Sequence, residues 1–200
     1  MSESITPQHP AEALLLAKIN PDVQDRLRKL RLMVFDVDGI LTDGRLWYSE
    51  HGEALKAFHV LDGYGLRLLD ENGIRVALIT GREGAIVARR AAELGIAEVH
   101  QGVRNKIEVL QDMAQRLGLD FSDIGYMGDD IIDITAMQRV GFAATVPEAP
   151  SYIAHISHWV STKSGGLGAV RECCDLILAS QHKLGAALMA QPLRTSGVIQ

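Results

Sequence analysis

Short apolar runs alternate with longer amphipathic stretches along most of this chain. The apolar runs carry little charge, which is typical of strands that are buried on both faces of a parallel sheet. We predict strands at residues 32–35, 74–79, 99–100, 124–127, 142–145 and 158–160. Two further runs, 45–48 and 54–58, flank the polar segment 49–53 and predict a β-hairpin.

Apolar residues recur at helical spacing between the predicted strands. The pair Asn72-Gly73 and the single residues Gly95 and Gly118 mark three helix ends. We predict helices at residues 11–19, 22–30, 64–71, 83–94, 106–117, 131–140 and 168–180. Regular alternation of strands and helices predicts an α/β fold with a doubly wound, Rossmann-like parallel sheet that helices cover on both faces.

The 200 residues suit one domain of ordinary size. We expect an N-terminal helical extension at 1–30, of which 1–10 form a loose tail, and a main domain at 31–180. Residues 181–200 are small and weakly patterned, so we expect a C-terminal tail that is either disordered or docked.

Composition narrows the class of protein further. With 47% hydrophobic and 22% charged residues, the chain has the balance of a soluble globular protein. A net charge of −5 argues against a nucleic-acid-binding surface. No early apolar run is long enough to span a membrane, so we expect no membrane partner and a cytoplasmic location. Two adjacent cysteines, Cys173 and Cys174, match neither a zinc spacing nor a disulfide framework.

Acidic residues follow the first predicted strand directly. Asp36 and Asp38 lie two residues apart, and Gly39 then permits a tight turn. A carboxylate at a strand end can attack phosphorus, and a second one can transfer protons to and from the reacting oxygens. We therefore predict Asp36 as a nucleophile and Asp38 as a general acid and base. Two acids this close repel each other, so a metal ion between them is expected.

Other candidate residues follow later strand ends. Thr80 and Gly81 end the second central strand, where a hydroxyl and backbone amides can bind a phosphoryl group. Lys106 opens a helix, where a cation suggests an anionic neighbour. Asp129 follows another strand and is the best candidate for a second carboxylate ligand of Mg²⁺, beside Asp36 and the main-chain carbonyl of Asp38.

The segment Gly-Asp-Asp-Ile-Ile-Asp at 128–133 leaves one choice open, because either Asp130 or Asp133 can support the metal site. A receiver domain also arranges acids, a threonine and a lysine around magnesium. Its lysine comes last in the sequence, whereas Lys106 precedes the final acids here. The order of the motifs therefore excludes a receiver domain.

Taken in order, these motifs resemble the haloacid dehalogenase superfamily of phosphohydrolases. Asp38 matches its hydrolases, whereas members that keep a phosphoenzyme for transport work carry a residue there that cannot act as a carboxylate base. The segments 53–65, 79–82, 101–102 and 165–172 resemble one branch, the 3-deoxy-D-manno-octulosonate 8-phosphate phosphatases. The resemblance covers roughly residues 31–180 and implies the haloacid dehalogenase fold, Mg²⁺ as cofactor and a sugar phosphate as substrate.

Neither the stretch between Asp38 and Thr80 nor the stretch between Thr80 and Lys106 is long enough for an extra domain. The fold is therefore expected to be capless, with the β-hairpin as its flap. Capless members of the superfamily are generally covered by a neighbouring subunit. The resemblance implies a homotetramer, in which the C-terminal tail of one subunit reaches its neighbour's site.

The resemblance also implies which residues lie near the substrate. It places the segment after the hairpin, including His59, Asp62 and Gly63, and the segment with Gly81 and Arg82 beside the sugar, with Asp38 and Lys106 at the phosphate. One departure matters, because Leu61 stands where the branch often has an arginine that can pair with the sugar carboxylate. That leaves Arg67, Arg82 and Arg90 as candidate partners of the carboxylate.

Two alternatives to an octulosonate phosphatase remain. The first is the same chemistry on another acidic sugar, such as a nine-carbon sialic or deaminated sialic acid 9-phosphate. The second is a catalytically silent, oligomerising binding subunit. The complete set of Asp36, Asp38, Thr80, Lys106 and Asp129 argues against the second, because a silent relative has no need of both acids.

Overall fold

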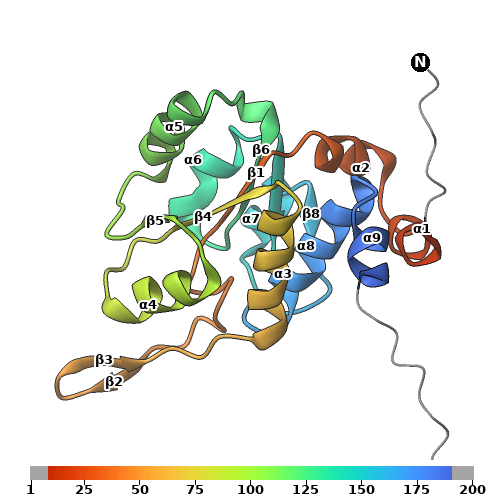
Figure 1. Ribbon diagram of the computed structural model, residues 1–200. Helices are drawn as coiled ribbons and strands as arrows, with labels where there is room; N and C mark the ends of the chain where they lie inside the picture. The colour runs from red at the N-terminus through yellow and green to blue at the C-terminus, as the bar shows by residue number, and fades with distance from the viewer. Residues whose placement is uncertain (1–8, 191–200) are drawn as a thin grey trace, which may run out of the picture.

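Six parallel strands form the central sheet of this computed structural model, which describes residues 9–190. The strand order is β5-β4-β1-β6-β7-β8 (Figure 1). The strands span Leu32–Phe35 (β1), Arg75–Ile79 (β4), Glu98–His100 (β5), Ile124–Met127 (β6), Phe142–Thr145 (β7) and Trp159–Val160 (β8). The predicted doubly wound sheet is therefore confirmed, and the bounds of β1, β6 and β7 agree with the prediction.

The central strand β1 is buried on both faces. Phe35 pairs in register with Leu78 of β4 and Met127 of β6, so three strands end side by side. Leu32 and Val34 belong to one hydrophobic core, whereas Met33 and Phe35 belong to the other. This alternation explains why β1 is apolar throughout, since both faces of its strand need apolar side chains.

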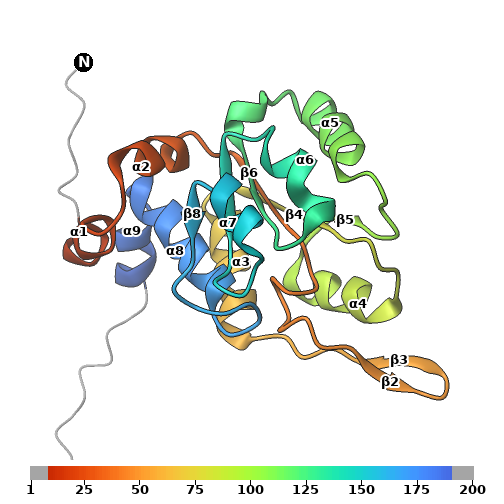
Figure 2. The ribbon, with the colours of Figure 1, turned by 180° about the vertical axis from the view of Figure 1, so that it is seen from behind.

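Helices cover both faces of the sheet, as Figures 1 and 2 show from opposite sides. The core on one face receives α3 and α8, and the core on the other receives α5 and α7. The helices span Val60–Glu71 (α3), Ala85–Leu94 (α4), Lys106–Leu117 (α5), Ile134–Met137 (α6), Ser151–Ile156 (α7) and Ala169–Ser180 (α8). Cys173 and Cys174 are free and lie buried in α8, where burial raises the pKa of both thiols.

Several helix predictions need correction, and helix α9 (Leu184–Met189) was not predicted. Helix α3 begins four residues before the predicted start at 64, because Gly63 and Gly65 pack closely against neighbouring side chains instead of breaking the helix. The predicted helix 131–140 is divided into a 3-10 turn, Ile131–Asp133, and the short α6. Helix α7 was not predicted. By contrast, α4 and α5 end at left-handed Gly95 and Gly118, as expected.

The predicted hairpin is present as β2 (Trp47–Ser49) and β3 (Gly52–Leu55), and it projects from the body of the molecule (Figures 1 and 2). Both strands differ from the predicted runs, since the turn is formed by Glu50 and His51 alone. The side chains of Trp47 and Leu55 are about half exposed. No additional domain interrupts the segments between the strand ends of the central sheet.

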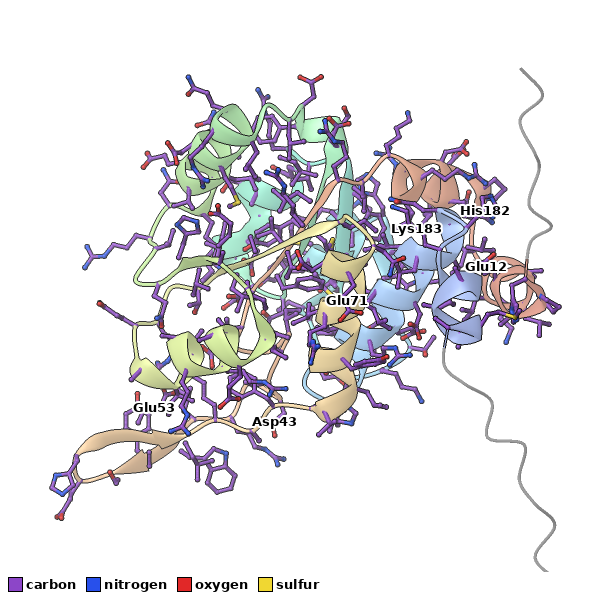
Figure 3. The ribbon with its side chains drawn as sticks, viewed as in Figure 1. Glu12, Asp43, Glu53, Glu71, His182 and Lys183 are labelled. Atoms are coloured by element: carbon purple, nitrogen blue, oxygen red, sulfur yellow. The ribbon has the colours of Figure 1, made fainter. Side chains whose placement is uncertain are left out.

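Both ends of the described chain pack on α8. The helices α1 (Pro10–Leu16), α2 (Pro21–Arg28) and α9 (Leu184–Met189) contact α8, so the first part of the tail is docked. Buried Glu12 accepts a hydrogen bond from the amide of Gly185 at 2.7 Å, and its label lies beside that of His182 in Figure 3. The expected reach of the tail, residues 181–200, into a neighbouring subunit stays a prediction, because residues 191–200 lie outside the described range. Of the helices within residues 9–190, none is long and apolar enough to cross a membrane.

Candidate active site

The candidate site lies where β1, β4 and β6 end. Asp36 follows β1, Thr80 follows β4, and Asp129 follows β6 after one residue. The order of strands reverses at β1, because the chain continues to β4 on one side and later to β6 on the other. Ligands of open α/β sheets bind at such a point. The sheet therefore brings the three predicted motifs together.

Lys106 is fully buried between two carboxylates. Its Nζ lies 3.0 Å from Oδ1 of Asp36 and 2.6 Å from Oδ1 of Asp133. Burial alone lowers the pKa of Lys106, but the charges of Asp36 and Asp133 reverse this effect and raise it above its ordinary value. Lys106 is therefore a permanent cation next to the predicted nucleophile.

Asp133 connects the two sides of the cluster. Its Oδ1 also accepts a hydrogen bond from the hydroxyl of Tyr126 at 2.7 Å, and its Oδ2 accepts bonds from the backbone amides of Asp129 and Asp130 at 3.1 and 3.2 Å. Asp130 instead caps the 3-10 turn through the amide of Ile131. Of the two acids left open by the sequence, Asp133 is the one that contacts the cluster.

Asp36, Asp129 and Asp133 offer carboxylate oxygens within 4.8 Å of one another. Burial raises the pKa of Asp36 to about 7, and Asp133 adds to the rise while Lys106 opposes it. Burial also raises the pKa of Asp129 to about 7, with further contributions from Asp36 and Asp133. Oδ1 of Asp129 is buried and has no hydrogen-bond partner within residues 9–190. An unpaired buried carboxylate among other acids suits a hard divalent cation such as Mg²⁺.

Gly39 makes the close approach of two strand ends possible. Its φ is +89°, and a Cβ at this position would lie 2.1 Å from Oδ2 of Asp129. Any larger residue would therefore displace Asp129. Beside Asp129 a cavity of about 310 Å³ opens, which Gly39, Asp43 and Arg45 also line.

Asp38 faces the base of the hairpin rather than Lys106. Its Oδ1 contacts Nζ of Lys56, which also lies 2.9 Å from Oε1 of Glu53. Nε of Arg82 lies 3.9 Å from Oδ2 of Asp38. Arg82 also donates a hydrogen bond to the hydroxyl of Tyr48 at 2.7 Å. The hairpin and the strand end of β4 therefore meet at Asp38.

Thr80 is buried at the end of β4, and its hydroxyl accepts a hydrogen bond from the amide of Arg82 at 3.2 Å. Gly81 has no tight contact that would forbid a side chain, because an added Cβ would approach other atoms only to 3.6 Å. The turn after β4 therefore positions Thr80 and Arg82 at the same sheet edge as Asp36.

Other predicted substrate residues lie apart from the acid cluster. Both oxygens of Asp62 accept bonds from backbone amides at the start of α8, those of Gly168 and Arg171. Burial raises the pKa of Asp62, and these two amides oppose the rise. Asp62 therefore joins α3 to α8 in this structure.

Gly63 provides space for the guanidinium of Arg90, which lies 5.8 Å from the ring centre of Phe58. Arg67 is exposed and pairs with Glu71 on the same helix at 3.5 Å. His59 precedes α3, and its Nδ1 is buried without a hydrogen-bond partner in the described part of the chain. None of these four residues contacts Asp36 or Asp129 in the hydrogen bonds and ion pairs of residues 9–190.

The structure adds three residues to the site that were not predicted from the sequence: Lys56, Glu53 and Tyr126. Lys56 and Glu53 belong to the segment 53–65, which resembles the octulosonate phosphatases. This resemblance was the one sequence signal that they lie near the site. Tyr126 lies within a buried strand. In an apolar run, the sequence does not show whether a tyrosine only packs its ring or also donates its hydroxyl to an acid.

Comparisons with known proteins show the family to which the chain belongs. A profile of the haloacid dehalogenase-like hydrolases matches residues 90–171. The chain is 41% identical over 169 residues to the 3-deoxy-D-manno-octulosonate 8-phosphate phosphatase KdsC of Salmonella typhimurium, which covers 84% of this chain and 90% of that protein.

Solved structures are similar as well. The phosphatase of the same name from Moraxella catarrhalis, crystallised with a magnesium ion, a phosphate ion and KDO, has a TM-score of 0.83 and 41% identity, covering 84% of this chain and 97% of that one. The enzyme from Yersinia pestis has a TM-score of 0.80 and 41% identity, covering 82% and 89%. On this similarity of sequence and of structure, the chain belongs to the 3-deoxy-D-manno-octulosonate 8-phosphate phosphatase family of haloacid dehalogenase-like hydrolases.

Proposed function

We propose that this protein is a magnesium-dependent phosphatase that hydrolyses 3-deoxy-D-manno-octulosonate 8-phosphate to the free sugar acid and phosphate. The pathway would be the synthesis of the lipopolysaccharide core. The observation that carries the proposal is the buried Asp36, held at 3.0 Å from Lys106 where three strands end, with Asp38 two residues further on. Membership of the octulosonate phosphatase family supports the choice of substrate.

Mg²⁺ fits the residues at this edge of the sheet. Asp36 and Asp129 supply carboxylate oxygens, and the main-chain carbonyl of Asp38 is the third proposed ligand. Asp133 supports them through its bonds to the amides of Asp129 and Asp130. When bound, the cation offsets the negative charge of the carboxylates and of the phosphoryl group, which lets an anionic nucleophile approach an anionic substrate.

In the first step, an oxygen of Asp36 attacks phosphorus, and the bond between phosphorus and the 8-oxygen of the sugar breaks. Asp38 gives its proton to that leaving oxygen. The products are the free sugar and an aspartyl-phosphate on Asp36. Lys106 balances charge on Asp36 and the phosphoryl group, and the Thr80 hydroxyl with the amide of Gly81 binds phosphoryl oxygens.

In the second step, a water molecule attacks the phosphorus of the aspartyl-phosphate, and Asp38 accepts a proton from this water. The bond between phosphorus and Asp36 breaks, which releases phosphate and restores both acids. Asp38 must therefore reach first the leaving oxygen and then the water.

For sugar recognition, we propose that Arg82 and Arg90 contribute to binding the sugar carboxylate, with His59 nearby. Arg82 already lies within 3.9 Å of Asp38, close to where the phosphoryl group must bind. Asp62, Gly63 and Arg67 remain candidates only if α3 contacts the substrate from a neighbouring subunit, because within one chain their described contacts are structural.

We further propose a closed homo-oligomer, with a homotetramer as the expected form, in the cytoplasm. The hairpin carries half-exposed apolar side chains, and no inserted domain covers the strand ends. A neighbouring subunit is the simplest cover for such a site. Sedimentation at several protein concentrations tests the stoichiometry.

The decisive experiment measures phosphate release in magnesium from the octulosonate 8-phosphate, a sialic acid 9-phosphate and a generic aryl phosphate. We expect a strong preference for the first. Release only from the nine-carbon substrate would keep the mechanism and contradict a role in lipopolysaccharide core synthesis. Release from none of the three would favour a silent binding subunit. Asp36→Asn should abolish turnover and keep the fold, as judged by circular dichroism, and retained turnover would exclude Asp36 as nucleophile.

A further inference from the structure

Lys56 is a buried cation that the mechanism above does not use. Its side chain is only 2% exposed, although a lysine that follows an exposed hairpin strand ordinarily extends into water. Its Nζ contacts Oδ1 of Asp38 and Oε1 of Glu53, the second at 2.9 Å. The two carboxylates together compensate the burial of the ammonium group, so the position of Lys56 is well defined.

The two oxygens of Asp38 have different surroundings. Oδ1 contacts the ammonium of Lys56. Oδ2 is buried and takes part in no hydrogen bond with any residue from 9 to 190, and the Nε of Arg82 remains 3.9 Å from it. An ammonium group only donates hydrogen bonds, so the oxygen that it contacts is held as an acceptor.

We propose that Lys56 is a positioning residue that makes Oδ2 the proton-transferring oxygen of Asp38. A protonated carboxyl group carries its hydrogen on one oxygen only. With Oδ1 accepting from Lys56, the proton resides on Oδ2, which gives it to the leaving oxygen of the sugar and later accepts one from water. The inference rests on the proposed function, because it assigns Lys56 a place in that reaction.

Glu53 is the second carboxylate that holds Lys56. Its Oε1 accepts from both Lys56 and, at 3.5 Å, from Nη2 of Arg82, and Figure 3 shows Glu53 on the hairpin near the body of the molecule. Arg82 in turn bonds to Tyr48 on the other hairpin strand. Residues of the hairpin and Lys56 directly after it therefore determine how Asp38 is oriented.

A comparison of two substrates with different leaving groups isolates the contribution of proton donation by Asp38. A sugar oxygen needs a proton to leave, whereas 4-nitrophenolate leaves without one. Rapid mixing of the magnesium-loaded protein with each phosphate, followed by acid quenching, measures how fast Asp36 is phosphorylated. In Lys56→Met we expect phosphorylation by the sugar phosphate to slow on the order of 10²-fold, since a well-placed general acid contributes that much or more.

Phosphorylation of Lys56→Met by 4-nitrophenyl phosphate should stay within about threefold of the wild-type rate, because this leaving group needs no general acid. Hydrolysis of the aspartyl-phosphate needs Asp38 as base and should slow, so 4-nitrophenolate appears as a burst followed by slow turnover. Lys56→Arg keeps a donor and should recover much of the sugar phosphate rate. Lys18→Met is the matched control, because Lys18 is exposed and belongs to the N-terminal segment and not to the hairpin.

Equal slowing with both phosphates in Lys56→Met would overturn the inference, because a purely structural role does not distinguish leaving groups. If Lys56→Met does not fold, Glu53→Gln provides the second test, since it weakens the anchor of Lys56 and should show the same selective loss to a smaller degree. The wild type separates this inference from the proposed function. A wild type that does not hydrolyse the octulosonate phosphate refutes the function, whereas active wild type with an unselective variant refutes the role of Lys56.

Discussion

At the scale of single residues, Asp133 shows how one buried acid can organise a site without being its nucleophile. It accepts bonds from Lys106, Tyr126 and two backbone amides. In Asp133→Asn the buried ammonium of Lys106 loses one of its two counter-charges, so we expect the free energy of unfolding to fall by about 3 kcal/mol. Urea unfolding measures the change. The control Asp130→Asn keeps a side-chain oxygen that can cap Ile131 at an exposed position, so it should change the free energy of unfolding by only a few tenths of a kcal/mol. Similar losses in both variants would contradict this role of Asp133.

Magnesium should stabilise the protein more at high than at low pH. The pKa of Asp36 and of Asp129 is raised from 3.8 to about 7 in the folded, metal-free protein. The folded state therefore binds more protons than the unfolded state between about pH 4 and pH 7, and its stability falls as the pH rises through that window. Mg²⁺ replaces these protons, so the gain in melting temperature should be larger near pH 8 than near pH 5.

Thermal unfolding with and without magnesium at the two pH values tests this dependence. Asp129→Asn removes one proposed ligand and should reduce the pH dependence of the gain. An equal gain at both values in the wild type would show that magnesium binds somewhere other than at these acids.

The roles of site residues could be predicted from the sequence where strand order brings their partners together. They could not be predicted where the partner comes from a distant part of the fold. Asp36, Thr80 and Asp129 could be placed together, because parallel strands end at one edge. The role of Asp62 could not, since its partners are amides of α8 that follow it by more than one hundred residues. Lys56 was missed for a similar reason, because its burial depends on how the hairpin meets Asp38.

At the scale of elements, the strands and helix ends with strong local sequence signals were predicted correctly. Short helices with weak signals were not predicted. The apolar strand β7 and the helix α5 with its terminal Gly118 agree with the prediction. Helices α7 and α9 are only six residues long, and such short helices gain their stability from packing rather than from their own sequence. In α9 this packing includes the bond between Gly185 and Glu12.

Glu12 is therefore expected to hold the two ends of the described chain together. In Glu12→Ala the buried amide of Gly185 loses its acceptor, which should lower the free energy of unfolding by about 2 kcal/mol. Hydrogen exchange should accelerate in α1 and α9, while phosphatase activity stays unchanged because Glu12 contacts no residue of the acid cluster. Glu71→Ala, which breaks only a surface pair with Arg67, is the control. A parallel loss of activity in Glu12→Ala would contradict the separation of this contact from the site.

At the scale of the whole molecule, the hairpin exposes apolar side chains that no other part of the described chain buries. Trp47 and Leu55 are cross-strand partners, and their side chains are 50% and 48% exposed. Neighbouring apolar side chains on a projecting hairpin are unfavourable in water and favourable when another protein surface buries them. Because no inserted domain covers the strand ends, these side chains make the hairpin the best candidate for the contact in the proposed oligomer.

If the proposed homo-oligomer forms through the hairpin, the double variant Trp47→Glu, Leu55→Glu should dissociate it, because charges placed in an apolar interface lose hydration without finding partners. Sedimentation velocity should show a smaller species, whereas Leu14→Glu, an equally apolar exposed position on α1, should leave the mass unchanged. If a neighbour covers the site, activity on the octulosonate phosphate should fall in the dissociated protein more than activity on an aryl phosphate, which needs fewer contacts. An unchanged mass would exclude the hairpin as the main interface, and dissociation with both activities retained would show that one subunit binds the sugar by itself.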